Sequence, residues 1–462
     1  MFFFVIAIPL PFLMQQNPLH KGISVVRSLI VVLLTLLLLL AVTALFSQEN
    51  ASILIKLKYY KENGIYGPKD SRVGYFIQLR NTLNDNQKGI IAFDVKNEFG
   101  QSIHHEDVSL FIKPRGSFGK ELNVDVAKLQ AGFYTASIGV STNQFNETKT
   151  YAFGIEPEKI KPHAISPADF SSFWDQAKNE LANINPQYRI TRRGDVSTLT
   201  HDVFLVEFQS LQNTTIRGWL SVPKGNRKYP VLYRIPDYMA NAYVETIDHT
   251  ACFSLDIRNT GNSADNGKIG FDNYLITGLN NQNDYIYKGA VMDCLRGVDF
   301  IYNNAALKLD TSKIIIRGAG QGASLAAATA ALSNKVKGIV MERPSMIDLR
   351  TRFTLGEIQN DIPWPIVAIK NYCAATKMGL DNFFKIWDYF DGLSFAPFVK
   401  CPVLVATALK GKICPPQCAY HFYNQLLVSQ REMYSSPDTD SSMNKGYAIF
   451  ENNWIREVLR IP

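Results

Sequence analysis

The sequence is poor in the residues that most often carry metal or acid–base chemistry. Its 462 residues include 6 cysteines and 7 histidines. The cysteines all lie in the C-terminal part, several of them inside apolar runs, so buried free thiols are the expected state. No second Cys/His pair accompanies Cys414 and Cys418 at the spacing that zinc requires. The sequence therefore predicts neither a metal site nor a cofactor.

The chain also lacks a dense block of one charge. Its formal net charge of +7 is spread along the sequence, and no run of Lys and Arg is concentrated enough to follow a phosphate backbone. This pattern argues against a nucleic-acid partner. The hydrophobic content of 46% is ordinary for a globular protein, and the length exceeds what one hydrophobic core usually serves. Two domains are expected.

One apolar stretch near the N-terminus has the length of a targeting segment. Leu29–Phe46 is interrupted only by two threonines and follows a basic region. We predict that residues 1–47 are a signal peptide or membrane anchor, with Met14 as the true start and Met1–Leu13 as an upstream extension. Export with cleavage after Ser47 is favoured over retention of Leu29–Phe46 as a membrane anchor. This N-terminal segment is the only part of the chain that is expected to contact a membrane. In either case the rest of the chain is expected to be periplasmic or extracellular.

Residues 48–157 show short alternating runs divided by turn residues, among them Gly74–Leu79, Ile90–Val95 and Gly132–Ile138. A period of two with regular turns predicts an all-β, immunoglobulin-like sandwich. The polar, proline-bearing segment Glu156–Pro162 marks the domain boundary. Because no aromatic platform for sugars is visible in this segment, a spacer role is favoured for the sandwich.

Residues 158–462 alternate apolar strands with helical segments. A hairpin of Val203–Phe208 with Ile216–Pro223 comes first, followed by buried strands at Val231–Ile235, Gly338–Met341 and Val403–Ala406. Near-continuous apolar strands separated by helices predict a doubly wound, mostly parallel α/β sheet.

The centre of this second domain has the strand–turn–helix pattern of a nucleophile elbow, but the turn has no nucleophilic residue. A buried strand at Lys313–Arg317 leads through the turn Gly318–Gly322 into an Ala-rich helix. In an α/β-hydrolase this turn is G-x-S-x-G, and Gly320 stands where the Ser belongs. The acid and then the base should follow along the chain, but the sole later histidine is His421. It falls in an amphipathic helix at Pro416–Leu426 and is predicted to be packed there.

Several further motifs of this domain resemble one family. In order and spacing they are similar to the acetyl xylan esterase and cephalosporin C deacetylase family of carbohydrate esterases, which belongs to the α/β-hydrolase superfamily. The resemblance runs over nearly all of Ala164–Pro462. The motifs that carry it are Pro167–Phe170, Asp256–Arg258, Tyr285–Tyr287, Asp293–Val298, Gly320–Gly322, Tyr389–Ala396, Lys400–Leu404 and Cys414–Pro416.

The resemblance implies that the catalytic triad is degenerate. The family's nucleophilic Ser falls on Gly320, its acid on Gly411, and its base near Ser441 in a loop without histidine. Pro236-Asp237 stands where the family has His-Gly, although the following Tyr238, whose family counterpart contributes to the oxyanion hole, is present. Since the members of a catalytic triad act as a unit, the replacement of all three predicts that the chain has lost acyl-transfer activity.

We therefore expect a pseudoenzyme that binds a carbohydrate, an acetylated small molecule or a protein partner. The Gln321 backbone N–H and the Tyr238 hydroxyl are predicted to converge on a ligand oxygen. The alternative is an active deacetylase that uses an unorthodox nucleophile such as Ser324. A Ser-Lys arrangement of Ser441 with Lys410 or Lys412 is disfavoured, because a lysine base must be desolvated. The resemblance also leaves open a role for the domain as the face of a homo-oligomer.

Overall fold

The computed structural model describes residues 52–162, 166–265, 267, 269–270 and 272–461. The predicted leader, including Leu29–Phe46, lies outside this range. Among the described residues, no helix combines the length and apolar character needed to cross a bilayer. All six cysteines are described, and each is buried with a free thiol, as the sequence predicts.

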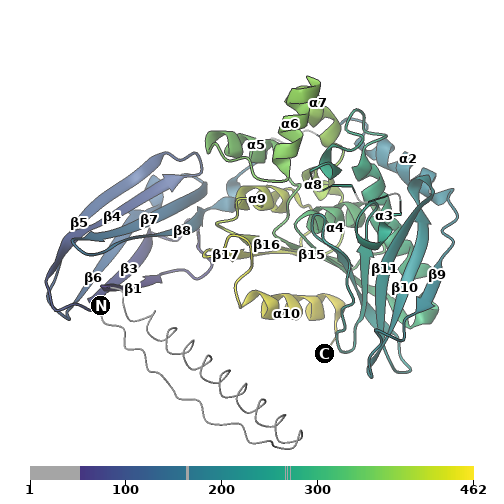
Figure 1. Cartoon of the computed structure of the whole chain (residues 1–462), viewed down its shortest axis with the longest axis horizontal. Helices are drawn as coiled ribbons and strands as arrows, with labels where there is room; N and C mark the ends of the chain where they lie inside the picture. The colour runs from purple at the N-terminus through teal and green to yellow at the C-terminus, as the bar shows by residue number, and fades with distance from the viewer. Residues whose placement is uncertain (1–51, 163–165, 266, 268, 271, 462) are drawn as a thin grey trace, which may run out of the picture.

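The N-terminal domain consists of two β-sheets that enclose one apolar core (Figure 1). The first sheet has the order β1-β3-β6 and is antiparallel. The second has the order β2-β8-β7-β4-β5, with only the short β2–β8 pair parallel. The strand bounds are β1 Ile53–Tyr59, β2 Ile65–Tyr66, β3 Arg72–Asn81, β4 Gln87–Asn97, β5 Ser102–Ile112, β6 Ser117–Asp125, β7 Gly132–Thr142 and β8 Asn146–Ile155.

The C-terminal domain is built on a nine-stranded sheet of order β17-β16-β15-β14-β12-β13-β11-β10-β9. The pairs from β17 to β13 are parallel, and those from β13 to β9 are antiparallel. The mostly parallel α/β sheet and the predicted β10–β11 hairpin are thus confirmed. The strands are β9 Arg189–Arg192, β10 His201–Ser210, β11 Thr214–Pro223, β12 Tyr229–Ile235, β13 Ala251–Asp256, β14 Leu309–Ala319, β15 Gly338–Glu342, β16 Val403–Ala408 and β17 Arg431–Ser436.

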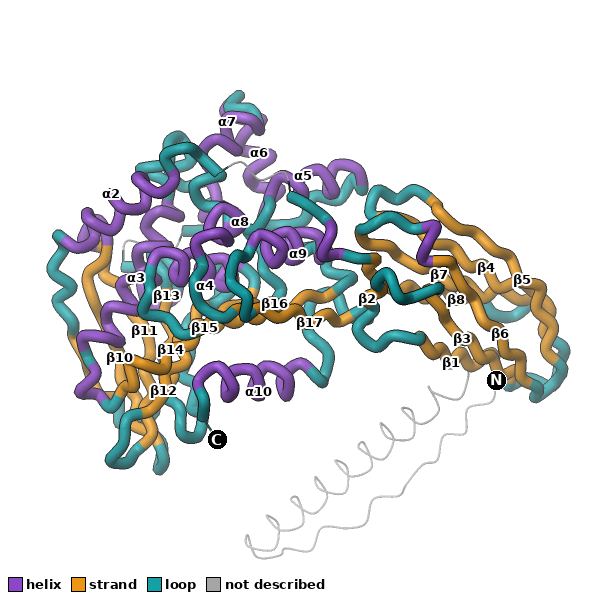
Figure 2. Tube along the Cα trace, turned by 180° about the vertical axis from the view of Figure 1, so that it is seen from behind, coloured by secondary structure: helices purple, strands orange, loops and turns teal. Residues whose placement is uncertain are grey.

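Helices cover both faces of this sheet, because its strands alternate apolar side chains above and below (Figure 2). Ile314 and Ile316 of β14 enter the large core beneath α3, α4 and α8, whereas Ile315 faces the smaller core beneath α10. The helices are α2 Phe170–Ala182, α3 Ile286–Asn303, α4 Gln321–Leu332, α5 Leu349–Ile358, α6 Ile366–Thr376, α7 Leu380–Trp387, α8 Gly392–Phe395, α9 Pro416–Gln425 and α10 Tyr447–Leu459.

The two domains meet at an apolar cluster formed by Phe133 and Ala152 of the sandwich with Leu409 and Tyr420 of the second domain. The Phe133 and Tyr420 ring centroids are 5.4 Å apart. Beside this cluster the Asn424 amide donates to the backbone carbonyls of the connecting segment at Pro157 and Ile160, each at 2.9 Å. The linker and the sandwich are therefore packed against the second domain.

We predict that Phe133→Ala lowers the free energy of unfolding by about 3 kcal/mol, because it leaves a cavity at a buried aromatic contact. Denaturant titration measures the loss. The matched control is Phe99→Ala, since Phe99 is half-exposed at the β4–β5 turn of the same domain and should change stability by less than about 1 kcal/mol. Equal losses in the two variants would contradict the packed junction.

Candidate functional site

Gly320 forms the elbow that the sequence predicts between β14 and α4. It directly precedes the helix and has φ 52° and ψ −118°, a left-handed backbone conformation that side chains with a Cβ adopt only under strain. The flanking glycines allow the close approach of the two elements, since a Cβ on Gly318 would lie 2.2 Å from the Gly322 carbonyl oxygen. The sharp strand-to-helix turn of a hydrolase is thus present.

The space that a side chain at position 320 would fill is occupied by the Asp237 carboxylate. A Cβ built on Gly320 would lie 1.8 Å from Oδ1 and 2.4 Å from Oδ2 of Asp237. Asp237 follows β12, and it reaches the elbow because the parallel strands β12 and β14 are neighbours and end at the same edge of the sheet. Gly320 and Asp237 are therefore sterically complementary.

The Asp237 carboxylate is held by two converging backbone donors. Its Oδ1 accepts the Gln321 N–H at 2.9 Å and the Tyr238 N–H at 2.6 Å. A pair of N–H groups converging on one oxygen, one of them at a helix N-terminus, is the arrangement of an oxyanion hole. In this chain the hole contains an oxygen of the protein itself.

The structure brings together both residues that the sequence analysis named as ligand-binding, Tyr238 and Gln321. It differs in the atom that Tyr238 contributes, because the donor is its backbone N–H and not its hydroxyl. The Tyr238 ring packs edge-on against Tyr274 and Trp364, and burial raises the pKa of its hydroxyl. The Tyr238 ring is therefore part of an aromatic cluster with Tyr274 and Trp364.

Gly411, the position matched to the family's acid, lies in a tight turn after β16. Its N–H donates to the Ala408 carbonyl at 3.0 Å, and a Cβ at this position would come within 2.7 Å of the Cys414 carbonyl oxygen. The backbone of this turn must shift before it can accommodate a carboxylate side chain.

Ser441, the position matched to the base, is exposed and donates its hydroxyl to Asp440 at 3.0 Å. The same loop is tied to the sandwich, because the Tyr59 hydroxyl donates to the Asp438 carboxylate at 2.8 Å. That bond, with partial burial, raises the pKa of Tyr59 to about 12. The loop is thus held both by the N-terminal domain and by its own domain, where the Thr439 carbonyl accepts the Lys410 N–H at 3.1 Å.

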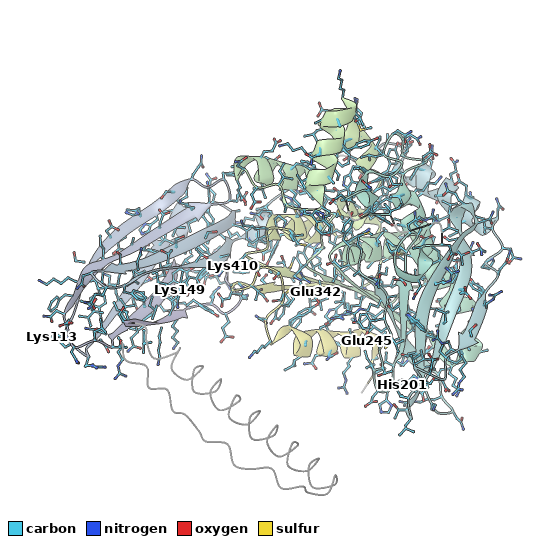
Figure 3. The ribbon with its side chains drawn as sticks, viewed as in Figure 1. Lys113, Lys149, His201, Glu245, Glu342 and Lys410 are labelled. Carbon is cyan, nitrogen blue, oxygen red and sulfur yellow. The ribbon has the colours of Figure 1, made fainter. Side chains whose placement is uncertain are left out.

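The alternative catalytic groups are engaged elsewhere. Ser324 is buried on α4 and donates its hydroxyl to the Ser345 carbonyl at 2.5 Å. The Lys412 ammonium pairs with Asp361 at 2.9 Å, and the Lys410 ammonium lies over the Tyr151 ring at the domain junction (Figure 3). None of these contacts forms a nucleophile–base pair.

His421 lies in α9 and is packed, as the sequence predicts, but it has a partner that the sequence did not reveal. Its Nδ1 lies 2.5 Å from Oδ2 of Asp348, at the N-terminus of α5. Burial opposes ionisation of the Asp348 carboxyl, yet the hydrogen bond and charge of His421 hold its pKa below the ordinary value. This buried pair joins α9 to α5.

A cavity of about 180 Å³ adjoins Asp237 on the α10 side of the sheet. Three arginines line it, and each is paired with an acid: Arg234 with Glu245, Arg317 with Glu451 and Arg343 with Glu342. Its charges are therefore balanced within the chain.

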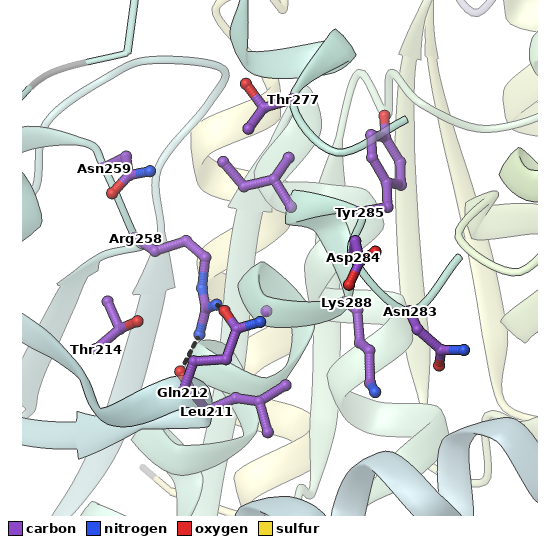
Figure 4. Close-up of a pocket in the computed structure, with 12 residues that line it drawn as sticks. Leu211, Gln212, Thr214, Arg258, Asn259, Thr277, Asn283, Asp284, Tyr285 and Lys288 are labelled. Carbon is purple, nitrogen blue, oxygen red and sulfur yellow. Dashed lines mark hydrogen bonds between the residues drawn. The ribbon is translucent and has the colours of Figure 1, made fainter. Parts of the chain in front are cut away.

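A second cavity, of about 220 Å³, lies between the β10–β11 turn and the start of α3 (Figure 4). Its wall is rich in amides and hydroxyls, with Arg258 at its base. The Arg258 guanidinium is fixed by Asp293 at 2.8 Å and by the Leu211 carbonyl at 3.1 Å. The polar side chains that line this groove include Gln212, Thr214, Asn259, Thr277, Asn283 and Lys288.

Residues 155–453 match the sequence model of the acetyl xylan esterase family. The chain belongs to the acetyl xylan esterase family. Acetyl esterase Axe7A of Xylanibacter ruminicola is 23% identical over 320 residues, which cover 65% of this chain and 68% of that protein. The family assignment agrees with the motifs in the sequence.

Solved structures show the same fold. The acetyl xylan esterase from Paenibacillus sp. R4 superposes with a TM-score of 0.59 and 23% identity, covering 65% of this chain and 98% of that one. Acetyl xylan esterase 1 from Thermoanaerobacterium sp. JW/SL YS485 gives a TM-score of 0.60 and 21% identity, with coverages of 66% and 98%. This similarity confirms the α/β-hydrolase fold.

We predict that Gly320→Ala and Asp237→Gly are strongly coupled. In the native background the added methyl group must displace the carboxylate from its two donors, so the alanine should cost more than about 3 kcal/mol of unfolding free energy. In the Asp237→Gly background only backbone strain remains, about 1–3 kcal/mol. A double-mutant cycle of denaturant titrations measures the difference. Equal costs in the two backgrounds would show that the carboxylate does not fill this space.

Proposed function

We propose that this chain is an exported, non-hydrolysing member of the acetyl xylan esterase family that binds carbohydrate. The observation that carries the proposal is the position of the Asp237 carboxylate, which fills both the space of the nucleophile and the oxyanion hole. The apolar segment Leu29–Phe46 supports export. The likeness to acetyl xylan esterases supports a polysaccharide as the source of the ligand.

The chemistry of ester hydrolysis supports the first part of this proposal. A serine attacks only when an imidazole takes its proton, and an acid must orient that imidazole. Gly320 has no side chain, Gly411 offers no carboxylate, and Ser441 donates to Asp440 in an exposed loop. In addition, an ester carbonyl oxygen would have to compete with Asp237 for the Gln321 and Tyr238 N–H groups. Hydrolysis by the family's route is therefore blocked at several steps.

The polar groove at α3 supports the second part. Oligosaccharides present many hydroxyl groups, and concave sites recognise them through a few fixed donors and acceptors. The side chains of Thr214, Asn283 and Gln212 are among those that line the groove, with Thr214 and Asn283 on opposite sides of it (Figure 4). Its volume of about 220 Å³ is smaller than the roughly 300–1,000 Å³ of sites for drug-sized ligands, so the groove is suited to a single sugar ring of an oligosaccharide.

We predict that the purified chain releases acetate from activated acetyl esters at a rate near the uncatalysed background. A working enzyme would turn over roughly 1–1,000 times per second. Incubation with a serine-directed phosphonate, followed by intact-mass measurement, should show no adduct, and Ser324→Ala should leave the rate unchanged. A rate in the enzymatic range that the phosphonate abolishes would refute the proposal.

We predict that Asn283→Ala weakens binding of acetylated xylo-oligosaccharides by several-fold, because one hydrogen bond to a sugar hydroxyl contributes about 1 kcal/mol. Isothermal titration calorimetry measures the dissociation constant. Asn453→Ala on the exposed face of α10 is the matched control and should bind as the native chain does. Identical affinities of the two variants would show that the groove is not where the oligosaccharide binds.

A further inference from the structure

Arg352 is a buried cation without a partner. It lies on α5, and only 2% of its surface is exposed. None of its three guanidinium nitrogens has a hydrogen-bond partner among the described residues. A buried arginine normally pairs with an acid or with several carbonyl oxygens, because an uncompensated charge is costly in the protein interior.

Two acids that bond to the start of α5, Asp348 and Asp391, are already committed to other donors. The two Asp348 oxygens accept from His421 and from the Thr351 N–H. Those of Asp391 accept from three backbone N–H groups and from the indole of Trp387, at 2.7–3.0 Å. Neither carboxylate has an oxygen directed at the guanidinium.

Two thiols, those of Cys414 and Cys418, are close enough to Arg352 to interact with it electrostatically. Burial raises the pKa of Cys414 to about 12 and raises the pKa of Cys418 well above its ordinary value. Both thiols are therefore neutral at physiological pH. A neutral thiol is a weak acceptor and cannot balance a full positive charge.

We propose that the buried guanidinium of Arg352 on α5, which has no hydrogen-bond partner among the described residues, is the centre of an internal binding site for a small anion. The ligand class is a halide or a small carboxylate. A guanidinium presents five N–H donors in one plane, which suits either a single spherical anion or a bidentate carboxylate.

This site is distinct from the oxyanion hole, and the inference does not depend on the proposed function. Arg352 lies on α5, whereas the donors of the oxyanion hole come from Tyr238 and from the start of α4. An anion at Arg352 would stabilise the packing of α5 against α9, which the His421–Asp348 pair also joins.

The test compares the native chain with Arg352→Met as sodium bromide rises from about 1 to 300 mM. Replacement of an unpaired buried charge by an apolar side chain should leave stability equal or higher at low bromide. As the bromide concentration rises, the melting temperature of the native chain should increase by about 2–4 °C more than that of the variant, because only the native chain binds the ion. Using the difference between the two chains removes general salt effects.

Arg350→Met is the matched control on the same helix. Arg350 is part-exposed and pairs with Asp388 at 2.6 Å, so its loss should lower stability without changing the response to bromide. Crystals of the native chain soaked in bromide provide a readout that needs no variant, and an anomalous peak within about 3.5 Å of the Arg352 nitrogens is expected. Absence of that peak, or equal bromide responses in native chain and Arg352→Met, would overturn the proposal and leave Arg352 solvated by internal water.

Discussion

The geometry of the candidate site depends on the hydrogen bonds between the Asp237 carboxylate and the backbone N–H groups of Gln321 and Tyr238. An oxyanion hole is a preorganised set of donors whose purpose is to meet a negative charge that appears only during reaction. Here the acceptor is the side-chain carboxylate of Asp237, which is covalently part of the chain. The donors are satisfied in the resting state, and the elbow keeps its sharp conformation because Gly320 has no side chain to collide with the carboxylate.

Similar constraints act at each of the three positions that the sequence resemblance assigns to the triad. A serine at position 320 needs the space of Asp237, a carboxylate at position 411 needs the space of the Cys414 carbonyl, and a base near Ser441 needs a loop that now bonds to Tyr59. These three requirements involve separate segments of the chain. A side chain added at position 320 or 411 would therefore have to displace a group that now occupies its space.

The helices, strands and turns could be predicted well from the sequence, because the periodicity of apolar residues and the spacing of glycines are local properties. The β10–β11 hairpin, the Gly320 turn and the helix that carries His421 follow from residues close together in the chain. The position of Asp237 could not be predicted in the same way. The sequence marked Pro236-Asp237 as a departure from the family, but only the pairing of β12 with β14 brings that carboxylate to the elbow.

Two other features lay beyond the reach of sequence patterns for the same reason. The His421–Asp348 pair joins residues 73 positions apart, and the isolation of Arg352 is a property of what surrounds it in three dimensions. Likewise, a motif names Tyr238 but does not say whether its hydroxyl or its N–H is the donor. The expected domain limits at residues 47 and 157 and the leader stay predictions.

An acetate soak of native crystals at high resolution tests the central claim most directly. We predict that Oδ1 of Asp237 stays within about 3 Å of the Gln321 and Tyr238 nitrogens, and that no acetate enters the space above Gly320. An acetate oxygen bound to those two N–H groups, with the Asp237 side chain turned away, would show that the hole is open to ligands. That result would contradict the account.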